Sequence, residues 1–128
     1  MAIENINTRV YNTNLRWVER WNAVLEKLSG VLDMVEEELG GSGYGDDDRE
    51  AVREKVESAR DVLNDAQLAI NEQAGKSYIV ELDSELNLGE QVSGFVRSFK
   101  SDLKLVRDSV AEAREAVAEA VKALRSIS

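Results

Sequence analysis

Apolar residues recur every three or four positions along most of this chain, in three long stretches. The first stretch runs from about residue 6 to residue 39, and its apolar residues fall into three rows with a heptad repeat. Rows at the a, d and e positions of a heptad make a stripe wide enough to face two partner helices. A helix over residues 6–39 is therefore predicted. The d row is Val10, Trp17, Val24 and Val31; the a row is Trp21, Leu28 and Val35; and the e row is Tyr11, Val18, Leu25, Leu32 and Leu39.

Two further stretches alternate steps of four and three, the pattern of helices with one buried seam. The second covers residues 46–73 and follows a glycine-rich connection, Gly40–Gly45, which favours a turn. Its start holds Asp47 and Glu50 at the spacing of a capping box. The third covers residues 88–127 and keeps the alternation from Val92 to Ile127. Both stretches are predicted to be helices.

Residues 77–86 break the pattern between the second and third helices. Tyr78, Val80 and Leu82 alternate with their neighbours as in a strand, but no second strand is available to pair with them. We therefore expect a short helix or an irregular segment over residues 77–86. Because short connections join antiparallel neighbours, the chain is predicted to be all-α, an elongated up-down-up three-helix bundle forming a single domain over residues 1–128.

This topology gathers aromatic residues at one end of the bundle, called here the aromatic end. Core packing explains them without a ligand, since bulky side chains fill the space between helices. The alternative is a ligand pocket at the aromatic end, with two polar contacts, Asn14 and Tyr78. The candidate ligand-binding residues are Asn14, Trp17, Trp21, Tyr78, Phe95 and Phe99.

Asn7 and Asn14 depart from the seam, because both occupy a-positions where an apolar residue is expected. A buried amide costs free energy unless it is hydrogen-bonded. Three explanations stay open: the asparagines are solvated or cap the helix, they set the register of the bundle, or they contact a ligand.

The densest charge feature lies around the first connection. Residues 33–50 hold eight carboxylates and one arginine, a local net charge of 1 − 8 = −7. This region is called here the acidic end. It could dock a basic partner or bind a hard cation, although its spacing does not match an EF-hand loop; a solvated loop beside a helix start explains it equally. The candidate partner-binding residues here are Glu36, Glu37, Asp46, Asp47 and Asp48.

The last helix is rich in alanine beyond its buried seam. Small residues allow another helix to approach closely, so Ala116 and Ala123 are candidates for contact with a partner or a second copy. Alanine is also the best helix former, and the same residues could simply stiffen the helix.

The composition argues against several functions. The chain has no histidine and no cysteine, which removes the commonest general base, thiol nucleophiles and the usual ligands of transition metals. The net charge of −9 argues against nucleic acid and anionic membranes. No phosphate-binding loop follows the glycines, and no apolar run could span a bilayer. We expect no enzyme activity, no metal and no cofactor.

These observations favour a soluble, cytoplasmic structural or protein-interaction bundle. It would self-associate or dock a protein partner through the alanine-rich third helix or the acidic end. The alternative function is a small-ligand sensor with its pocket at the aromatic end.

Overall fold

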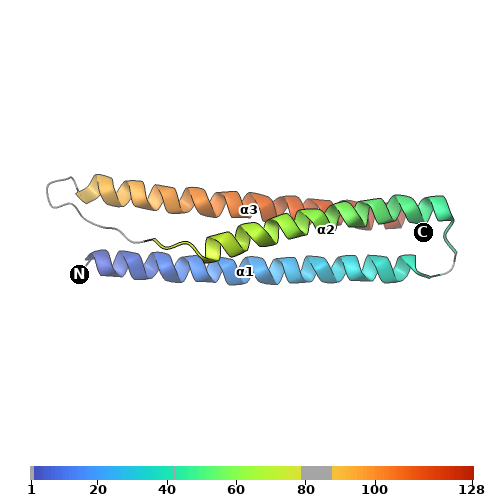
Figure 1. Cartoon of the computed structure of the whole chain (residues 1–128), viewed down its shortest axis with the longest axis horizontal. Coiled ribbons are helices and arrows are strands. Elements are labelled where there is room, and N and C mark those ends of the chain that lie inside the picture. Colours follow the sequence, from blue (N-terminus) through green and yellow to red (C-terminus); the bar gives the residue numbers. More distant parts are fainter. Residues whose placement is uncertain (1, 42, 79–87) are drawn as a thin grey trace.

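The computed structural model describes residues 2–41, 43–78 and 88–128, which form three α-helices and no strand (Figure 1). Helix α1 spans Ala2–Leu39, α2 spans Asp46–Ala74 and α3 spans Leu88–Ile127. In Figure 1, α1 and α3 run in the same direction, and α2 runs in the opposite direction. Every pair of helices is in contact. The predicted all-α, up-down-up three-helix bundle is confirmed.

The helix boundaries differ from the prediction mainly at the start of α1. This helix begins at Ala2 rather than near residue 6, because the asparagines that follow do not interrupt it. The chain has no proline, so no residue removes a helical hydrogen-bond donor. Helix α2 ends at Ala74, where the Gly75 N–H donates to the carbonyls of Asn71 and Glu72 at 3.2 Å each.

The predicted capping box at the start of α2 does not form. Gly45 is the N-cap residue, and no side chain caps the helix. Asp46, Asp47 and Asp48 lie in the first turn instead, where their charges favour the positive end of the helix dipole. Arg49 Nη2 reaches back to donate to the Gly41 carbonyl at 2.7 Å and ties the connection to the helix.

Of the short helix or irregular segment expected over residues 77–86, the structure describes only the first two residues. Ser77 and Tyr78 are not helical, and residues 79–86 lie outside the described residues. Tyr78 lies between α2 and α3, where its hydroxyl is hydrogen-bonded to Gln73 and Asp102.

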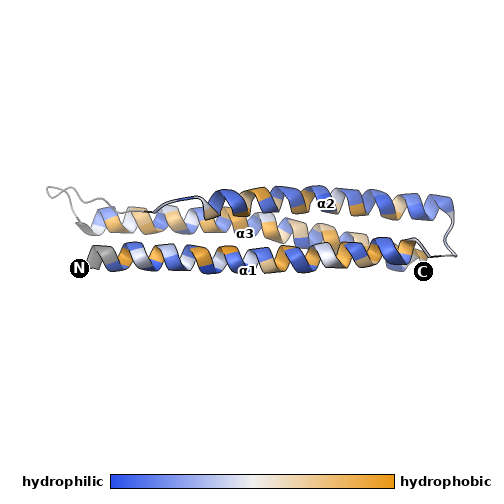
Figure 2. Ribbon diagram, turned by 60° about the horizontal axis from the view of Figure 1, so that its bottom comes forward, coloured by the Kyte–Doolittle hydropathy of each residue, from blue (hydrophilic) through white to orange (hydrophobic). Residues whose placement is uncertain are grey.

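The core follows the predicted seams. Hydrophobic residues recur along all three helices, and much of the outer surface of α2 is hydrophilic (Figure 2). In α1 the a and e rows are the most buried, and the d-row residues Trp17, Val24 and Val31 are half-buried beside the core. The stripe is wide because α2 and α3 cover different flanks of α1, although Leu28 of the a row is half-buried and Tyr11 of the e row is 61% exposed. The buried apolar residues of α2 are Val52, Val56, Ala59, Leu63, Ala66 and Ile70.

Candidate functional site

A buried amide pair lies where α2 ends against α1. Asn14 is 4% exposed and Gln73 is 1% exposed, and both occupy seam positions of their helices. Gln73 Nε2 donates to Asn14 Oδ1 at 2.8 Å, and Asn14 Nδ2 donates to the Gln73 backbone carbonyl at 3.1 Å. Because buried amides cost free energy when unpaired, this reciprocal pairing lets both residues replace apolar ones in the seam.

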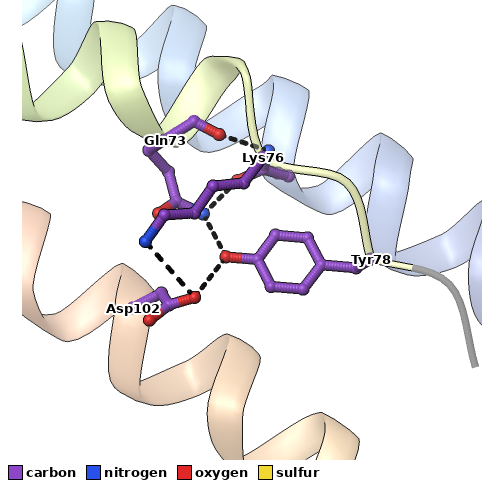
Figure 3. Close-up of polar contacts among 5 residues, drawn as sticks. Gln73, Lys76, Tyr78 and Asp102 are labelled. Carbon is purple, nitrogen blue, oxygen red and sulfur yellow. Dashed lines mark hydrogen bonds and ion pairs between the residues drawn. The ribbon is translucent and has the colours of Figure 1, made fainter.

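Tyr78 extends the pair to α3 (Figure 3). Gln73 Nε2 also donates to the Tyr78 hydroxyl at 2.9 Å, and that hydroxyl donates to Asp102 Oδ2 at 2.5 Å. Lys76 Nζ lies 3.6 Å from the same carboxylate oxygen. The polar cluster therefore joins α1, the end of α2, the following connection and α3. Its members are Asn14, Gln73, Lys76, Tyr78 and Asp102.

The environment of Tyr78 keeps its phenol protonated. The pKa of Tyr78 is raised to about 12, first by burial and then by the hydrogen bond to Asp102, while the hydrogen bond from Gln73 lowers it. A protonated hydroxyl can donate to Asp102 while accepting from Gln73, so the chain of hydrogen bonds has a single direction.

One acceptor of the cluster has no donor. Gln73 Oε1 is buried and accepts no hydrogen bond from the described residues. Buried polar atoms without a partner are uncommon in folded proteins, so this oxygen marks a point where the cluster can take a further donor.

A cavity of about 310 Å³ adjoins the cluster. Its wall comes from the first turns of α1 and from the connection after α2, and most of its side chains are polar. This volume is at the lower limit for small-molecule sites. The lining residues are Asn7, Thr8, Tyr11, Asn14, Lys76, Ser77 and Tyr78.

The structure divides the six candidate ligand-binding residues into two aromatic groups. Trp17 and Trp21 stack with centroids 5.3 Å apart, and the Arg20 guanidinium lies 4.9 Å from the Trp17 ring centre. Tyr78 meets Phe95 and Phe99 edge to face, at 6.2 Å and 4.8 Å. Trp21 and Phe99 are buried, Trp17 and Phe95 are half-buried, and none of these four lines the cavity. Asn14 and Tyr78 do line it.

The burial of Asn14 decides among the three explanations for the asparagines. The solvated or capping explanation is wrong for Asn14, which is buried in the middle of α1 and hydrogen-bonded to Gln73. Asn7 is half-buried and lines the cavity. Register setting and ligand contact both remain compatible with these positions.

At the acidic end, one arginine neutralises part of the charge. Arg60 of α2 bonds Asp33 and Glu36 of α1 at 2.8 Å each, and the hydrogen bonds to Glu36 and then Asp33 raise the Arg60 pKa. Glu38 accepts a long bond from the Tyr44 hydroxyl, 3.5 Å. Within the described residues, the other five carboxylates of this end are exposed and take part in no ion pair or hydrogen bond. They are Glu37, Asp46, Asp47, Asp48 and Glu50.

The alanine candidates lie partly inside the bundle. Ala116 and Ala123 are half-buried and pack against the hydrophobic core, whereas Ala111 and Ala118 are exposed. A larger groove, about 740 Å³, lies between α1 and α2 and ends at the Arg60–Asp33 ion pair. The sequence pattern pointed to no function for this groove.

Three members of the polar cluster were not predicted from the sequence: Gln73, Lys76 and Asp102. A signal for Gln73 was available, because it continues the 4–3 series of α2 and is a second polar residue at a seam position. Two amide side chains at the seam positions of neighbouring antiparallel helices are expected to hydrogen-bond to each other if they lie at the same height along the bundle. Lys76 and Asp102 carried no comparable signal, since charged residues are frequent on all three helices.

The described residues contain no group of three or more acidic side chains placed to hold a metal ion. Among them, no helix is both long and apolar enough to cross a membrane. No protein-family model, curated protein or solved structure matches the chain.

Proposed function

We propose that this protein is a non-enzymatic interaction bundle that self-associates through its acidic end. The observation that carries the proposal is the unpaired charge at that end: five exposed carboxylates have no partner among the described residues, although Arg60 shows that cross-helix ion pairs form nearby. Concentrated charge of one sign speeds and orients association with a surface of the opposite sign.

The alanine-rich face of α3 is the weaker contact. Ala116 and Ala123 already contribute to packing within the bundle, which leaves Ala111 and Ala118 as the exposed alanines of that region. Single small side chains bury little area, so they add less to an interface than the charged end does.

Sedimentation equilibrium from micromolar to millimolar protein tests the proposal. We expect a mass that rises with concentration at low salt and falls towards the monomer near 1 M salt, where the Debye length is about 3 Å. The neutralising variant Glu37→Gln/Asp47→Asn/Glu50→Gln should shift the association to higher concentration. A monomer over the whole range at low salt would contradict self-association.

A second candidate function is supported by the cavity beside the polar cluster. Its lining combines amide and hydroxyl groups with the rings of Tyr11 and Tyr78, which suits a small molecule that has both apolar surface and hydrogen-bonding groups. A thermal-shift screen of such molecules tests this function. A true ligand should raise the melting temperature of the wild type and lose that effect in Tyr11→Ala, because Tyr11 lines the cavity but is 61% exposed. A shift unchanged in Tyr11→Ala would place the binding elsewhere.

A further inference from the structure

All four basic residues of α1 and five of the seven on α3 lie in one row on each helix; Lys122 and Arg125, near the end of α3, are not counted in these rows. On α3 the row follows 4–3 spacing from Ser93 to Ala118 and holds no acidic residue; on α1 a similar row runs from Arg9 to Lys27 and holds every basic residue of that helix. All nine side chains are exposed. The two rows, called here the basic face, contain Arg9, Arg16, Arg20 and Lys27 of α1, and Arg97, Lys100, Lys104, Arg107 and Arg114 of α3.

The contacts of α2 lie on other flanks of α1 and α3 than these rows. On α1, α2 takes the opposite flank, where Gln67 bonds Asn22 at 2.9 Å and Arg60 bonds Asp33. On α3, the end of α2 and its connection contact the flank that carries Asp102. Arg20, stacked on the half-buried Trp17, belongs to the row on α1.

The two helices that carry the rows are parallel and in contact. The polar cluster links Asn14 of α1 to Asp102 of α3 through Gln73 and Tyr78, and α1 and α3 run in the same direction (Figure 1). Within each row, like charges lie three or four residues apart, as at Arg16 and Arg20 and at Lys100 and Lys104. Like charges at this spacing are destabilising.

Within the described residues, no other helix neutralises this face. No residue of the basic face forms an ion pair with another helix, and the single ion pair involves Arg107 and its own neighbour Asp108 at 3.9 Å. Nine of the 16 basic residues lie here, in a protein of net charge −9. The basic face thus concentrates positive charge, and this concentration lowers the stability of the bundle. Such a surface is typical of a binding site for a negatively charged partner.

We propose that the basic face docks the acidic end of a second copy of this chain, joining copies head to tail. This inference rests on the proposed self-association and names the surface that the acidic end would meet. Seven of the nine residues of the basic face lie in the N-terminal halves of α1 and α3, and Lys27 and Arg114 lie beyond the midpoints of these helices. The acidic end lies where α1 passes into α2 (Figure 1), and among the described residues no side chain of the basic face forms an ion pair with it.

The charge pattern favours this occupant over an external polyanion. The net charge of −9 repels nucleic acid and anionic membranes at long range, whereas the acidic end brings five unpaired carboxylates on the same molecule. When the basic face of one copy binds the acidic end of another, the dimer still has one free acidic end and one free basic face. Further copies can bind to these free surfaces, so the expected assembly is an open chain.

Complementary charge reversal tests the pairing. The first variant reverses the basic face, Arg16→Glu/Lys100→Glu/Lys104→Glu, and the second reverses the acidic end, Glu37→Lys/Asp47→Lys/Glu50→Lys. We expect each variant alone to self-associate at least about a hundredfold more weakly than the wild type, since like charges replace opposite ones. An equimolar mixture should associate again, in assemblies where the two variants alternate. The acidic end of the first variant meets the basic face of the second, and the two reversed surfaces are also opposite in charge.

A matched control carries the same change in net charge outside the face, at Arg53→Glu/Lys55→Glu/Lys122→Glu, all exposed and without ion pairs in the described structure. The control should associate at least as tightly as the wild type. Circular dichroism at each concentration confirms that all variants keep their helices.

Three results would overturn the proposal. If the wild type associates and the basic-face variant associates equally well, the docking site is wrong while the proposed function stands. If the mixture stays monomeric, the two surfaces do not pair. If the wild type is a monomer at every concentration, both this inference and the proposed self-association fail; binding of heparin or anionic vesicles by that monomer would instead assign the face to a polyanion.

Discussion

Asn14 and Gln73 show what a polar residue needs in order to occupy a heptad seam. The Gln73 side chain donates to Asn14 Oδ1, and the Asn14 side chain donates to the Gln73 backbone carbonyl, so two hydrogen bonds join α1 and α2. Each such hydrogen bond typically contributes about 1 kcal/mol to the free energy of unfolding. A buried polar group that has lost its hydrogen-bond partner costs more than that bond contributed.

Replacing one member of the pair should therefore be worse than replacing both. Asn14→Leu is expected to lower the free energy of unfolding by about 1–3 kcal/mol, because Gln73 loses a buried acceptor. Asn14→Leu/Gln73→Leu should recover most of that loss, since two apolar side chains then meet in the seam. Urea unfolding of the three proteins measures the coupling, with the exposed Asn12→Leu as control. A single variant as stable as the double would show that the amide pair is not coupled.

Tyr78 should make the stability depend on alkaline pH. Its folded pKa of about 12 lies above the ordinary value of 10.0, so the folded state holds the proton more tightly than the unfolded state. The stabilisation is complete below pH 10 and is lost as the pH rises through about 12. In Tyr78→Phe this part of the pH dependence should disappear.

Thermal unfolding of wild type and Tyr78→Phe between neutral pH and pH 12 provides the measurement. Tyr11→Phe is the matched control, because Tyr11 is exposed and lies outside the hydrogen-bonded cluster. A difference between wild type and Tyr78→Phe that stays constant with pH would contradict the assigned role of the phenol.

At the scale of single elements, the unbroken length of α1 is the notable property. The helix passes through Gly30 without a break, although glycine inside a helix is less favourable than alanine by roughly 0.5–1 kcal/mol. A Cβ built at Gly30 meets no atom within 4 Å, because the residue lines the open groove between α1 and α2.

Gly30→Ala should accordingly raise the free energy of unfolding by about 0.5–1 kcal/mol, through helix propensity alone. Gly43→Ala is the contrasting change, because Gly43 has a φ of 113° that a side chain disfavours. That variant should lose stability although its Cβ also meets open space. Denaturant unfolding of both variants gives the comparison, and a loss of stability in Gly30→Ala would mean that the open groove is occupied.

At the scale of the whole molecule, charge is sorted along the rod. Carboxylates gather where α1 passes into α2, and basic side chains gather in one row on α1 and one on α3. The second feature opposes folding slightly, since like charges three or four residues apart on a helix are destabilising.

Relieving this repulsion should stabilise the bundle. Lys100→Glu places a carboxylate three residues after Arg97 and four before Lys104. It is expected to raise the free energy of unfolding by about 0.2–1 kcal/mol, with the gain shrinking as salt screens the charges. Lys55→Glu, an exposed reversal on α2, is the control and should bring no such gain. Thermal unfolding at low and high salt separates the two cases; an equal gain in both variants would trace the effect to helix propensity instead of the neighbouring charges.

The sequence by itself determined the number, type and order of the helices. A 4–3 spacing of apolar residues is a local property, and it makes an amphipathic helix whatever the partners are. The glycine-rich connection and the loss of periodicity after Gln73 then separate the helices, so the bundle topology followed from short connections alone. Both charged features are also visible in the sequence, as a run of carboxylates and as two rows of basic residues.

Only the tertiary structure decided which residues meet. The level at which α2 ends sets Gln73 opposite Asn14, and the path of the chain after Gly75 then brings the Tyr78 hydroxyl to Asp102. These contacts join residues far apart in the chain, and a shift of α2 by one turn, about 5.4 Å, would replace every one of them. The same contacts join α1 to α3 through the end of α2, which neither helix shows alone.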